Sequence, residues 1–231
     1  MVASLILAAT MLLPEEATLP PFAGQYTLFR NGREVGIARI EYGPDSDGGF
    51  RIRSRLEASV LAGALRFTAH EESRLGFTAG EPRSESFSGR REQPLRRREQ
   101  RLDFDWRRGE VRVRDSRHGE SRHPLPGPAL DPLAALIRAA LAAQRGETEF
   151  RFLEVNRGAP KLRRGRVVGT RSESVGGREI TCVLVERLSE DPERRSASCH
   201  APSLGYAPVF ILHADDGEEL ILRLRAGSAS G

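Results

Sequence analysis

Short segments in which apolar and polar residues alternate follow one another along the chain from Gly24 onwards. A period of two places the apolar side chains on one face of a β-strand. Gly, Asp, Asn and Pro residues, which favour turns, separate the segments. The segments are GQYTLFR, REVGIARIEYG, GFRIRSRLEASV, LRFTAHEESRLGF, RLDFDW, EVRVRD, TEFRFLEVN, GRVVGTRSESV, REITCVLVERL, PVFILHA and LILRLRA. This pattern predicts a mainly β protein with one curved antiparallel sheet that forms an open or half barrel.

The first two segments are joined by Asn31 and Gly32. This dipeptide favours a two-residue hairpin turn because both residues tolerate positive φ angles. We therefore expect a β-hairpin centred on Asn31-Gly32.

One stretch has helical rather than strand periodicity. Asp131 is placed to cap a helix, Pro132 suits the first helical position and Gly146 suits the C-terminal end. The apolar positions between them are Leu133, Leu136, Ile137, Ala140 and Leu141. We expect one main α-helix at about residues 132–145, whose apolar stripe covers the open side of the sheet.

The N-terminal segment, residues 1–23, carries an uncharged apolar run from Val2 to Leu13 that ends at Pro14. The run is too short to span a bilayer but has the length of the apolar core of a secretory signal. No basic residue precedes it, so a buried first strand or helix is the alternative. We expect a periplasmic or exported protein, with a single β-rich domain at 24–226 and a disordered tail at 227–231.

The chain of 231 residues has a formal net charge of +4 and only one lysine, Lys161. The stretch from Arg83 to Arg108 contains nine arginines and five acidic residues, so its net charge equals that of the whole chain. Such a cluster binds phosphate or carboxylate groups, or it forms a solvated face neutralised by its own carboxylates. The candidate anionic-ligand patch is Arg96, Arg97, Arg98 and Arg101, on an Arg-rich hairpin at residues 90–114. Nucleic acid is disfavoured, because only Phe104 and Trp106 are present to stack on bases.

Cys182 and Cys199 are the only cysteines, and they lie symmetrically about the point between Glu190 and Asp191. A hairpin centred there brings them together as a disulfide on one face of two antiparallel strands. The pairs then expected opposite each other are Cys182 with Cys199, Leu184 with Ala197, and Glu186 with Arg195. Two reduced core cysteines are the main alternative. A metal site is disfavoured, because only His200 lies near either cysteine in the sequence.

No catalytic motif emerges from the sequence. There is no nucleophile elbow, phosphate loop or dinucleotide fingerprint, and we expect neither a metal nor a cofactor. Asp103 and Asp105 share one strand face, as paired acids of a glycan hydrolase would, but arginines surround them. The histidines are scattered: His70, His118, His123, His200 and His213.

Four segments occur together in an order that resembles an exported bacterial family, domain of unknown function 3108. They are LFRNGREVGIARIEY, LDFDW, DPLAALIRAAL and CHAPSLGYAPVFIL. The residues that carry the resemblance include Asn31, Gly32, Gly36, Asp131, Pro132, Pro202, Tyr206 and Pro208. The resemblance implies a half-barrel in the cell envelope, similar in outline to the lipoprotein-localisation carriers. It implies no chemistry, and Cys199 stands where the family pattern has an aromatic residue.

From these observations we expect a non-enzymatic cell-envelope protein that binds a lipid, an acyl chain or an apolar partner segment in the groove of the half-barrel. The alternative is an envelope scaffold or a module that binds acidic polysaccharide through the Arg-rich hairpin. A hydrolase of envelope glycans is a third hypothesis. The sequence leaves the ligand, any envelope partner protein and the oligomeric state open.

Overall fold

The computed structural model describes residues 19–60, 65–94 and 96–229. The first half of these residues forms strands β1 (Phe22–Arg30), β2 (Arg33–Pro44), β3 (Phe50–Val60), β4 (Leu65–Thr78), β5 (Glu81–Gln93), β6 (Arg96–Asp105), β7 (Glu110–Asp115) and β8 (Gly119–Pro124). The second half forms β9 (Ala129–Leu130), helix α1 (Ala134–Arg145), β10 (Glu149–Glu154), β11 (Lys161–Val175), β12 (Arg178–Leu188), β13 (Arg195–Ala201), the 3₁₀ helix η1 (Pro202–Leu204), β14 (Ala207–Asp215) and β15 (Glu218–Ala229).

All fifteen strands belong to one sheet that does not close, with β8 at one edge and β9 at the other. Strands that follow each other in the chain pair antiparallel from β1 to β8 and from β10 to β15, while β9 and β10 are parallel. The first and last strands also pair, with Leu28 opposite Leu222. The predicted fold class, a curved antiparallel open barrel with one main helix, is confirmed.

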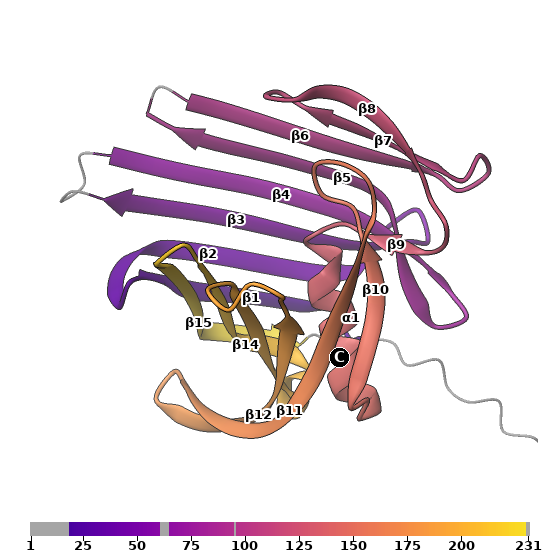
Figure 1. The fold of residues 1–231 in the computed structure, drawn as a ribbon. Coiled ribbons are helices and arrows are strands. Elements are labelled where there is room, and N and C mark those ends of the chain that lie inside the picture. Colours follow the sequence, from indigo (N-terminus) through magenta and orange to yellow (C-terminus); the bar gives the residue numbers. More distant parts are fainter. Residues whose placement is uncertain (1–18, 61–64, 95, 230–231) are drawn as a thin grey trace, which may run out of the picture.

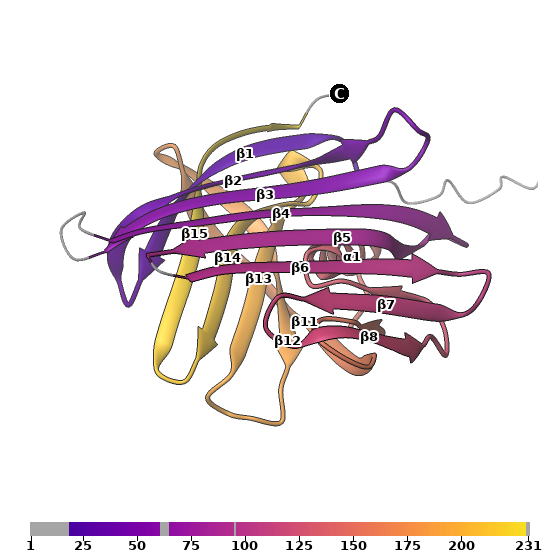
Figure 2. The same cartoon turned by 90° about the horizontal axis from the view of Figure 1, so that it is seen from above.

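The sheet has two arms, an N-terminal arm (β1–β8) and a C-terminal arm (β9–β15). Their strands run in clearly different directions, and α1 lies between the arms (Figures 1 and 2). We call the face toward α1 the inner face and the opposite one the outer face. The inner face holds the main core, which in the N-terminal arm includes Ile52, Leu75, Phe87, Leu102 and Val113. This one-sided burial explains the alternating sequence pattern.

Helix α1 starts two residues later than expected, because Pro132 and Leu133 form a turn that leads into it. The side chain of Asp131 accepts hydrogen bonds from the N–H groups of Leu133 and Ala134, so it has the expected capping role. Gly146 ends the helix in the left-handed conformation, with φ of 65°. Of the five predicted apolar positions, four are buried and Leu136 is half-buried.

The hairpin predicted at Asn31-Gly32 is confirmed. It joins β1 to β2, with φ angles of 49° at Asn31 and 74° at Gly32. The amide of Asn31 also donates to the carbonyl of Glu219, and its Oδ1 accepts from the N–H of Glu219. This turn therefore also fixes the hairpin between β14 and β15.

The expected boundaries at 24 and 226 need correction. Leu19 and Phe22 are only 5% and 3% exposed within the core, so the folded region begins before residue 24. Strand β15 continues to Ala229, with Ala229 opposite Phe22, so a disordered tail is wrong for residues 227–229. The apolar run from Val2 to Leu13 lies outside the described residues.

The disulfide between Cys182 and Cys199 is present, with a Cα–Cα distance of 5.4 Å. The register expected for it is wrong by two residues, because Leu184 lies opposite Cys199 and Glu186 lies opposite Ala197. The loop at 189–194 is centred between Asp191 and Pro192 rather than one residue earlier. A slip of two keeps every side chain on its face, so Cys182 lies diagonally from Cys199 and still reaches it.

Both cysteines face the outer side of the sheet, yet both are fully buried. The long hairpin β11–β12 provides the cover, since it carries a register shift between Val167 and Gly169 and its far part contacts β14 and β15. There the Arg171 guanidinium lies 4.2 Å from the ring centre of Phe210, directly opposite Cys199. The bent hairpin thus makes a second apolar layer around the disulfide.

We predict that Gly32→Val lowers the free energy of unfolding by about 1 kcal/mol or more, because a β-branched residue resists positive φ. No atom lies near the position of an added Cβ, so the backbone conformation alone causes the loss. Gly32→Asn is the matched control and should cost less. Urea unfolding of both variants provides the measurement, and equal losses would contradict a left-handed turn at this position.

We predict that replacing both cysteines by alanine lowers the free energy of unfolding by about 2 to 3 kcal/mol and leaves the protein folded. The cross-link spans a sequence separation of 17 and so removes only a short loop from the unfolded ensemble. Chemical denaturation gives the difference. Thiol titration of the folded, unreduced protein should find no reactive thiol, and two free thiols would refute the bond.

Candidate functional site

A groove of about 270 Å³ lies on the inner face, between α1 and the sheet. Side chains from both arms and from the helix line it, and most of them are apolar. They include Ile40, Leu133, Ala135, Leu136, Ala139, Phe150, Phe152, Val185, Ile211 and Leu222, with Ser54, Glu186, Arg187, Ser196, Ser198 and His213 as polar members. The volume is near the lower end of the range for small-molecule sites.

Phe150 forms one wall of the groove and depends on a glycine opposite it. Gly165 on β11 pairs with Phe150 on β10, and a Cβ at Gly165 would lie 2.2 Å from the ring. The ring therefore occupies the space that a side chain would take. The guanidinium of Arg138 lies 4.6 Å from the ring centre and forms an ion pair with Glu147 at 2.7 Å, which fixes α1 against this wall.

Asp131 connects α1 to the N-terminal arm from a completely buried position. Its Oδ2 accepts hydrogen bonds from the hydroxyls of Ser73 and Ser84, at 2.5 and 2.6 Å. Its Oδ1 accepts from the amides of Leu133 and Ala134, at 2.9 and 3.0 Å. Burial raises the pKa of Asp131 even though these bonds favour the ionised form.

His200 supports the groove from the C-terminal arm, beside the lining residue Ser198. Its Nδ1 donates to the carbonyl of Tyr206, at 3.0 Å, and its Nε2 accepts from the hydroxyl of Ser198, at 2.8 Å. These partners assign the proton of the neutral ring to Nδ1. The ring is fully buried, and burial lowers the pKa of His200 to about 4.

The other residues that carried the family resemblance have structural roles. The hydroxyl of Tyr26 donates to the carbonyl of Pro208, at 2.7 Å, inside the core. Pro202 opens the 3₁₀ helix η1, and Tyr206 follows it with φ of 62°.

A Cβ at Gly36 would lie 2.0 Å from the carbonyl oxygen of Glu57, so only glycine fits there. Pro132 alone lines the groove directly.

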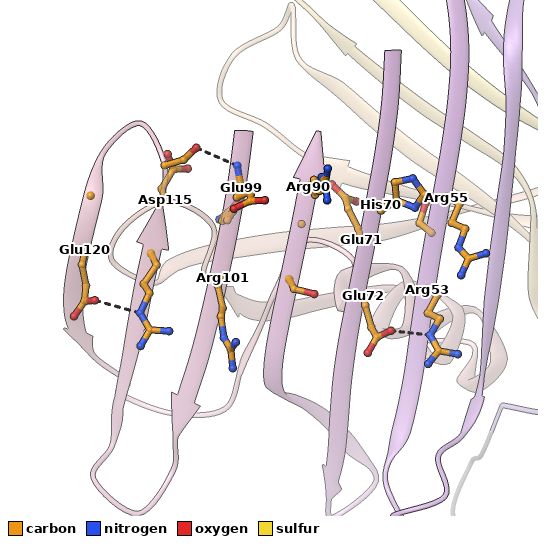
Figure 3. A pocket seen from close by; sticks show the side chains of 17 residues that line it. Arg53, Arg55, His70, Glu71, Glu72, Arg90, Glu99, Arg101, Asp115 and Glu120 are labelled. Atoms are coloured by element: carbon orange, nitrogen blue, oxygen red, sulfur yellow. Dashed lines mark hydrogen bonds and ion pairs between the residues drawn. The ribbon is translucent and has the colours of Figure 1, made fainter. Parts of the chain in front are cut away.

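A larger hollow, of about 790 Å³, lies on the outer face of β3–β8 (Figure 3). Its side chains form ion pairs across neighbouring strands, such as Arg53 with Glu72 at 2.7 Å and Arg114 with Glu120 at 3.2 Å. Five arginines line it, and four of them form ion pairs with carboxylates on the same face. The arginines are Arg53, Arg55, Arg90, Arg101 and Arg114, and the carboxylates paired with four of them are Glu72, Glu92, Asp103 and Glu120.

The structure divides the predicted arginine patch between the two faces of β6. Arg97 and Arg101 lie on the outer face, where they pair with Glu99 and Asp103. Alternation along the strand places Arg96 and Arg98 on the inner side. There Arg98 binds the buried carboxylate of Asp115, at 2.7 Å. The four arginines therefore do not form one surface.

The paired acids suggested by the sequence are bound to neighbouring groups. Asp103 pairs with Arg101 at 2.9 Å and with Arg114 at 3.1 Å. Asp105 accepts hydrogen bonds from the backbone amides of Arg107 and Arg108. Within residues 19–60, 65–94 and 96–229, no three His, Cys, Asp or Glu side chains gather as a metal site requires.

Two buried ion-pair clusters were missed from the sequence. Glu154 on β10 binds Arg163 at 2.7 Å and Arg187 at 2.8 Å, which joins the end of the groove to β11 and β12. Glu173 binds Arg171 and Arg223 under the bent hairpin. Each glutamate lies in an alternating charged segment that looks solvent-exposed, and only the tertiary fold brings two arginines to it.

The family model of DUF3108, described as a protein of unknown function, matches residues 25–225. The chain belongs to the DUF3108 family. The resemblance that the sequence motifs suggested is thus confirmed. The comparison with curated proteins gave no match.

Three solved structures were compared with this DUF3108 protein. A crystal structure of a β-barrel-like protein of domain of unknown function DUF1849 from Brucella abortus has a TM-score of 0.60 at 10% identity, over 92% of this chain and 99% of that chain. The crystal structure of MucB has a TM-score of 0.32 at 16% identity, over 92% of this chain and 54% of that chain. A DUF1089 family protein from Pseudomonas aeruginosa has a TM-score of 0.30 at 12% identity, over 94% of this chain and 93% of that chain. The first similarity supports a β-barrel-like fold and nothing further.

In the described part of the chain, no helix has the length and apolar character needed to cross a bilayer.

We predict that His200 makes the protein less stable in acid. Its folded pKa of about 4 is below the ordinary value of about 6.5, so the unfolded state binds more protons between these values. The stabilisation is complete above pH 6.5 and is lost as the pH falls through 4, by roughly 3 kcal/mol in total. Urea unfolding of the wild type and of His200→Gln between pH 4 and 7 measures this difference.

The amide of His200→Gln donates and accepts hydrogen bonds but does not titrate. We expect this variant to be less stable at pH 7 and to lose less stability on acidification. Equal pH slopes in the two proteins would show that His200 is not the responsible group.

Proposed function

We propose that this DUF3108 protein is a non-enzymatic binding protein of the cell envelope that holds the hydrocarbon chain of a lipid or acyl compound in the groove. The observation that carries the proposal is the groove itself, an inner-face space lined mainly by apolar side chains from both arms and α1. Exposed apolar surface of this kind costs free energy in water, and a bound hydrocarbon chain removes that cost.

The alternatives receive less support from the arrangement of charged groups. A module for acidic polysaccharide needs a surplus of positive charge, whereas four of the five arginines of the outer hollow are already paired with carboxylates. A glycan hydrolase needs two free carboxylates facing one cleft, whereas Asp103 and Asp105 are engaged by arginines and backbone amides. An apolar segment of a partner protein remains an alternative occupant of the groove.

An exported location agrees with two features. The disulfide between Cys182 and Cys199 belongs to an oxidising compartment such as the periplasm. The apolar run from Val2 to Leu13 has the length of a signal core. We therefore propose a periplasmic protein whose ligand comes from the envelope.

We predict that Ala135→Phe weakens binding of an uncharged apolar dye, N-phenyl-1-naphthylamine, by about tenfold, because the added ring fills the groove. Ala135 is half-buried and lines the groove, so the ring has a route to solvent and folding is retained. Ala159→Phe is the matched control, since Ala159 is exposed in the β10–β11 loop and is not part of the groove lining. Dye fluorescence at increasing protein concentration gives the affinity.

A second variant, Leu136→Ser, lowers the apolar character of the same wall and should also weaken dye binding. Melting temperatures establish that both groove variants are folded. Native mass spectrometry of the purified protein should in addition detect a co-purified lipid. If the folded Ala135→Phe and Leu136→Ser variants bind the dye as the wild type does, the groove is not the binding site.

A further inference from the structure

Arg157 is exposed and, like several other arginines, has no carboxylate partner within the described part of the chain. It lies in the loop after β10, next to Asn156, which accepts a hydrogen bond from the side chain of Gln100 on the inner face of β6. The loop therefore packs over the inner side of the N-terminal arm. An arginine on this side of the arm that has no carboxylate partner is available to a ligand.

Three arginines meet around a small hollow at this point. Arg91, Arg98 and Arg157 line it, and its volume is about 10 Å³, roughly the space for one water molecule. Arg91 pairs with Glu71 at 2.8 Å, and Arg98 pairs with Asp115 at 2.7 Å. Two carboxylates thus face three guanidinium groups, which leaves one positive charge uncompensated.

The surroundings of Arg157 show the effect of this excess charge. Partial desolvation lowers the pKa of its guanidinium, and the positive charges of Arg98 and Arg91 lower it further. The neighbouring cations therefore repel one another, and an anion placed between them would relieve the repulsion.

The hollow lies next to the groove. Ser54 on β3 lines the groove, and it lies directly opposite Glu71 on β4, which lines the hollow. Neighbouring strands are about 4.8 Å apart, so only one strand spacing separates the two. Desolvation lowers the pKa of His213, another lining residue, and the charges of Arg187 and Arg91 lower it further while Asp215 opposes them.

We propose that the ligand is an amphiphile with an anionic headgroup, whose single hydrocarbon chain lies in the groove and whose headgroup binds Arg157 together with Arg91 and Arg98. The inference rests on the proposed function and adds the chemical class of the ligand. Guanidinium groups bind phosphate, sulfate and carboxylate oxygens through paired N–H donors. The hollow is too small to enclose such a group, so the headgroup lies over it and remains in contact with water.

The groove volume limits what enters it. At about 270 Å³ it is smaller than most pockets for drug-sized ligands, and it accommodates one chain rather than a whole two-chain lipid. A lipid with two chains would leave the second chain outside. A single-chain phosphate is therefore the appropriate probe.

The experiment measures displacement of N-phenyl-1-naphthylamine by dodecyl phosphate, by the uncharged dodecanol and by inorganic phosphate, each below any micelle-forming concentration. The proteins are the wild type, Arg157→Gln and Arg55→Gln. Arg55 is an exposed arginine of the outer hollow that also forms no ion pair in the described residues, so its variant is matched in charge and chemistry. Melting temperatures establish that each variant is folded.

We expect dodecyl phosphate to bind the wild type at least tenfold more tightly than dodecanol at low salt, and this preference to decrease as salt is added. Arg157→Gln should abolish most of the preference without changing dodecanol affinity, and Arg55→Gln should retain it. Inorganic phosphate should not displace the dye but should weaken dodecyl phosphate binding.

Three results would overturn the proposal. Equal affinities for dodecyl phosphate and dodecanol would reject the anionic headgroup while leaving the groove as a chain-binding site. Equal losses in Arg157→Gln and Arg55→Gln would attribute the preference to overall charge. If calorimetry shows that inorganic phosphate binds as tightly as dodecyl phosphate, the arginines are an anion site separate from the groove. Absence of dye binding in the wild type would instead reject the proposed function itself.

Discussion

The carboxylate of Asp131 is the constraint on which the groove depends. Moving a charge from water into a protein interior costs several kcal/mol, and here no arginine or lysine forms an ion pair with it in the described residues. Two serine hydroxyls from adjacent strands and two amides from the first turn of α1 replace the lost water. These donors come from two separate parts of the chain. The carboxylate is therefore satisfied only when the helix is docked on β4 and β5, and this docking creates the space between helix and sheet.

The sequence predicted the features that depend on neighbouring residues. Asn31-Gly32 and Gly146 act through their own backbone conformation and Asp131 through its side chain, and all have the predicted roles. Pro132 lies in the turn before α1 and not in its first turn. The alternating pattern likewise predicted strands with one buried face. The pairing of β1 with β15 joins residues some two hundred positions apart, and no local pattern indicates it.

The disulfide shows how far the pairing of two strands can be predicted from the sequence. The two cysteines were correctly predicted to share one face of the sheet, because side chains alternate strictly along a strand. They were correctly paired, because the chain has only two cysteines. The register was wrong because it depended on the centre of the loop at 189–194, and neither hydrophobicity nor charge fixes that centre. The burial of both cysteines on the outer face was also beyond prediction, since it depends on the bend of β11 over β14 and β15.

The distribution of charge connects the composition of the chain to the candidate site. Arginines supply almost all of its positive charge, and a basic stretch at 83–108 looks in sequence like a single binding patch. Strand alternation sends successive side chains to opposite faces, so ion pairs with glutamates and aspartates, within and between strands, neutralise most arginines of the outer hollow. On the inner face, Arg91 and Arg98 are joined by Arg157 from a loop more than fifty residues away. An uncompensated charge therefore arises where the tertiary fold adds a third arginine to two ion pairs, next to the apolar groove, and not where arginines are densest in the sequence.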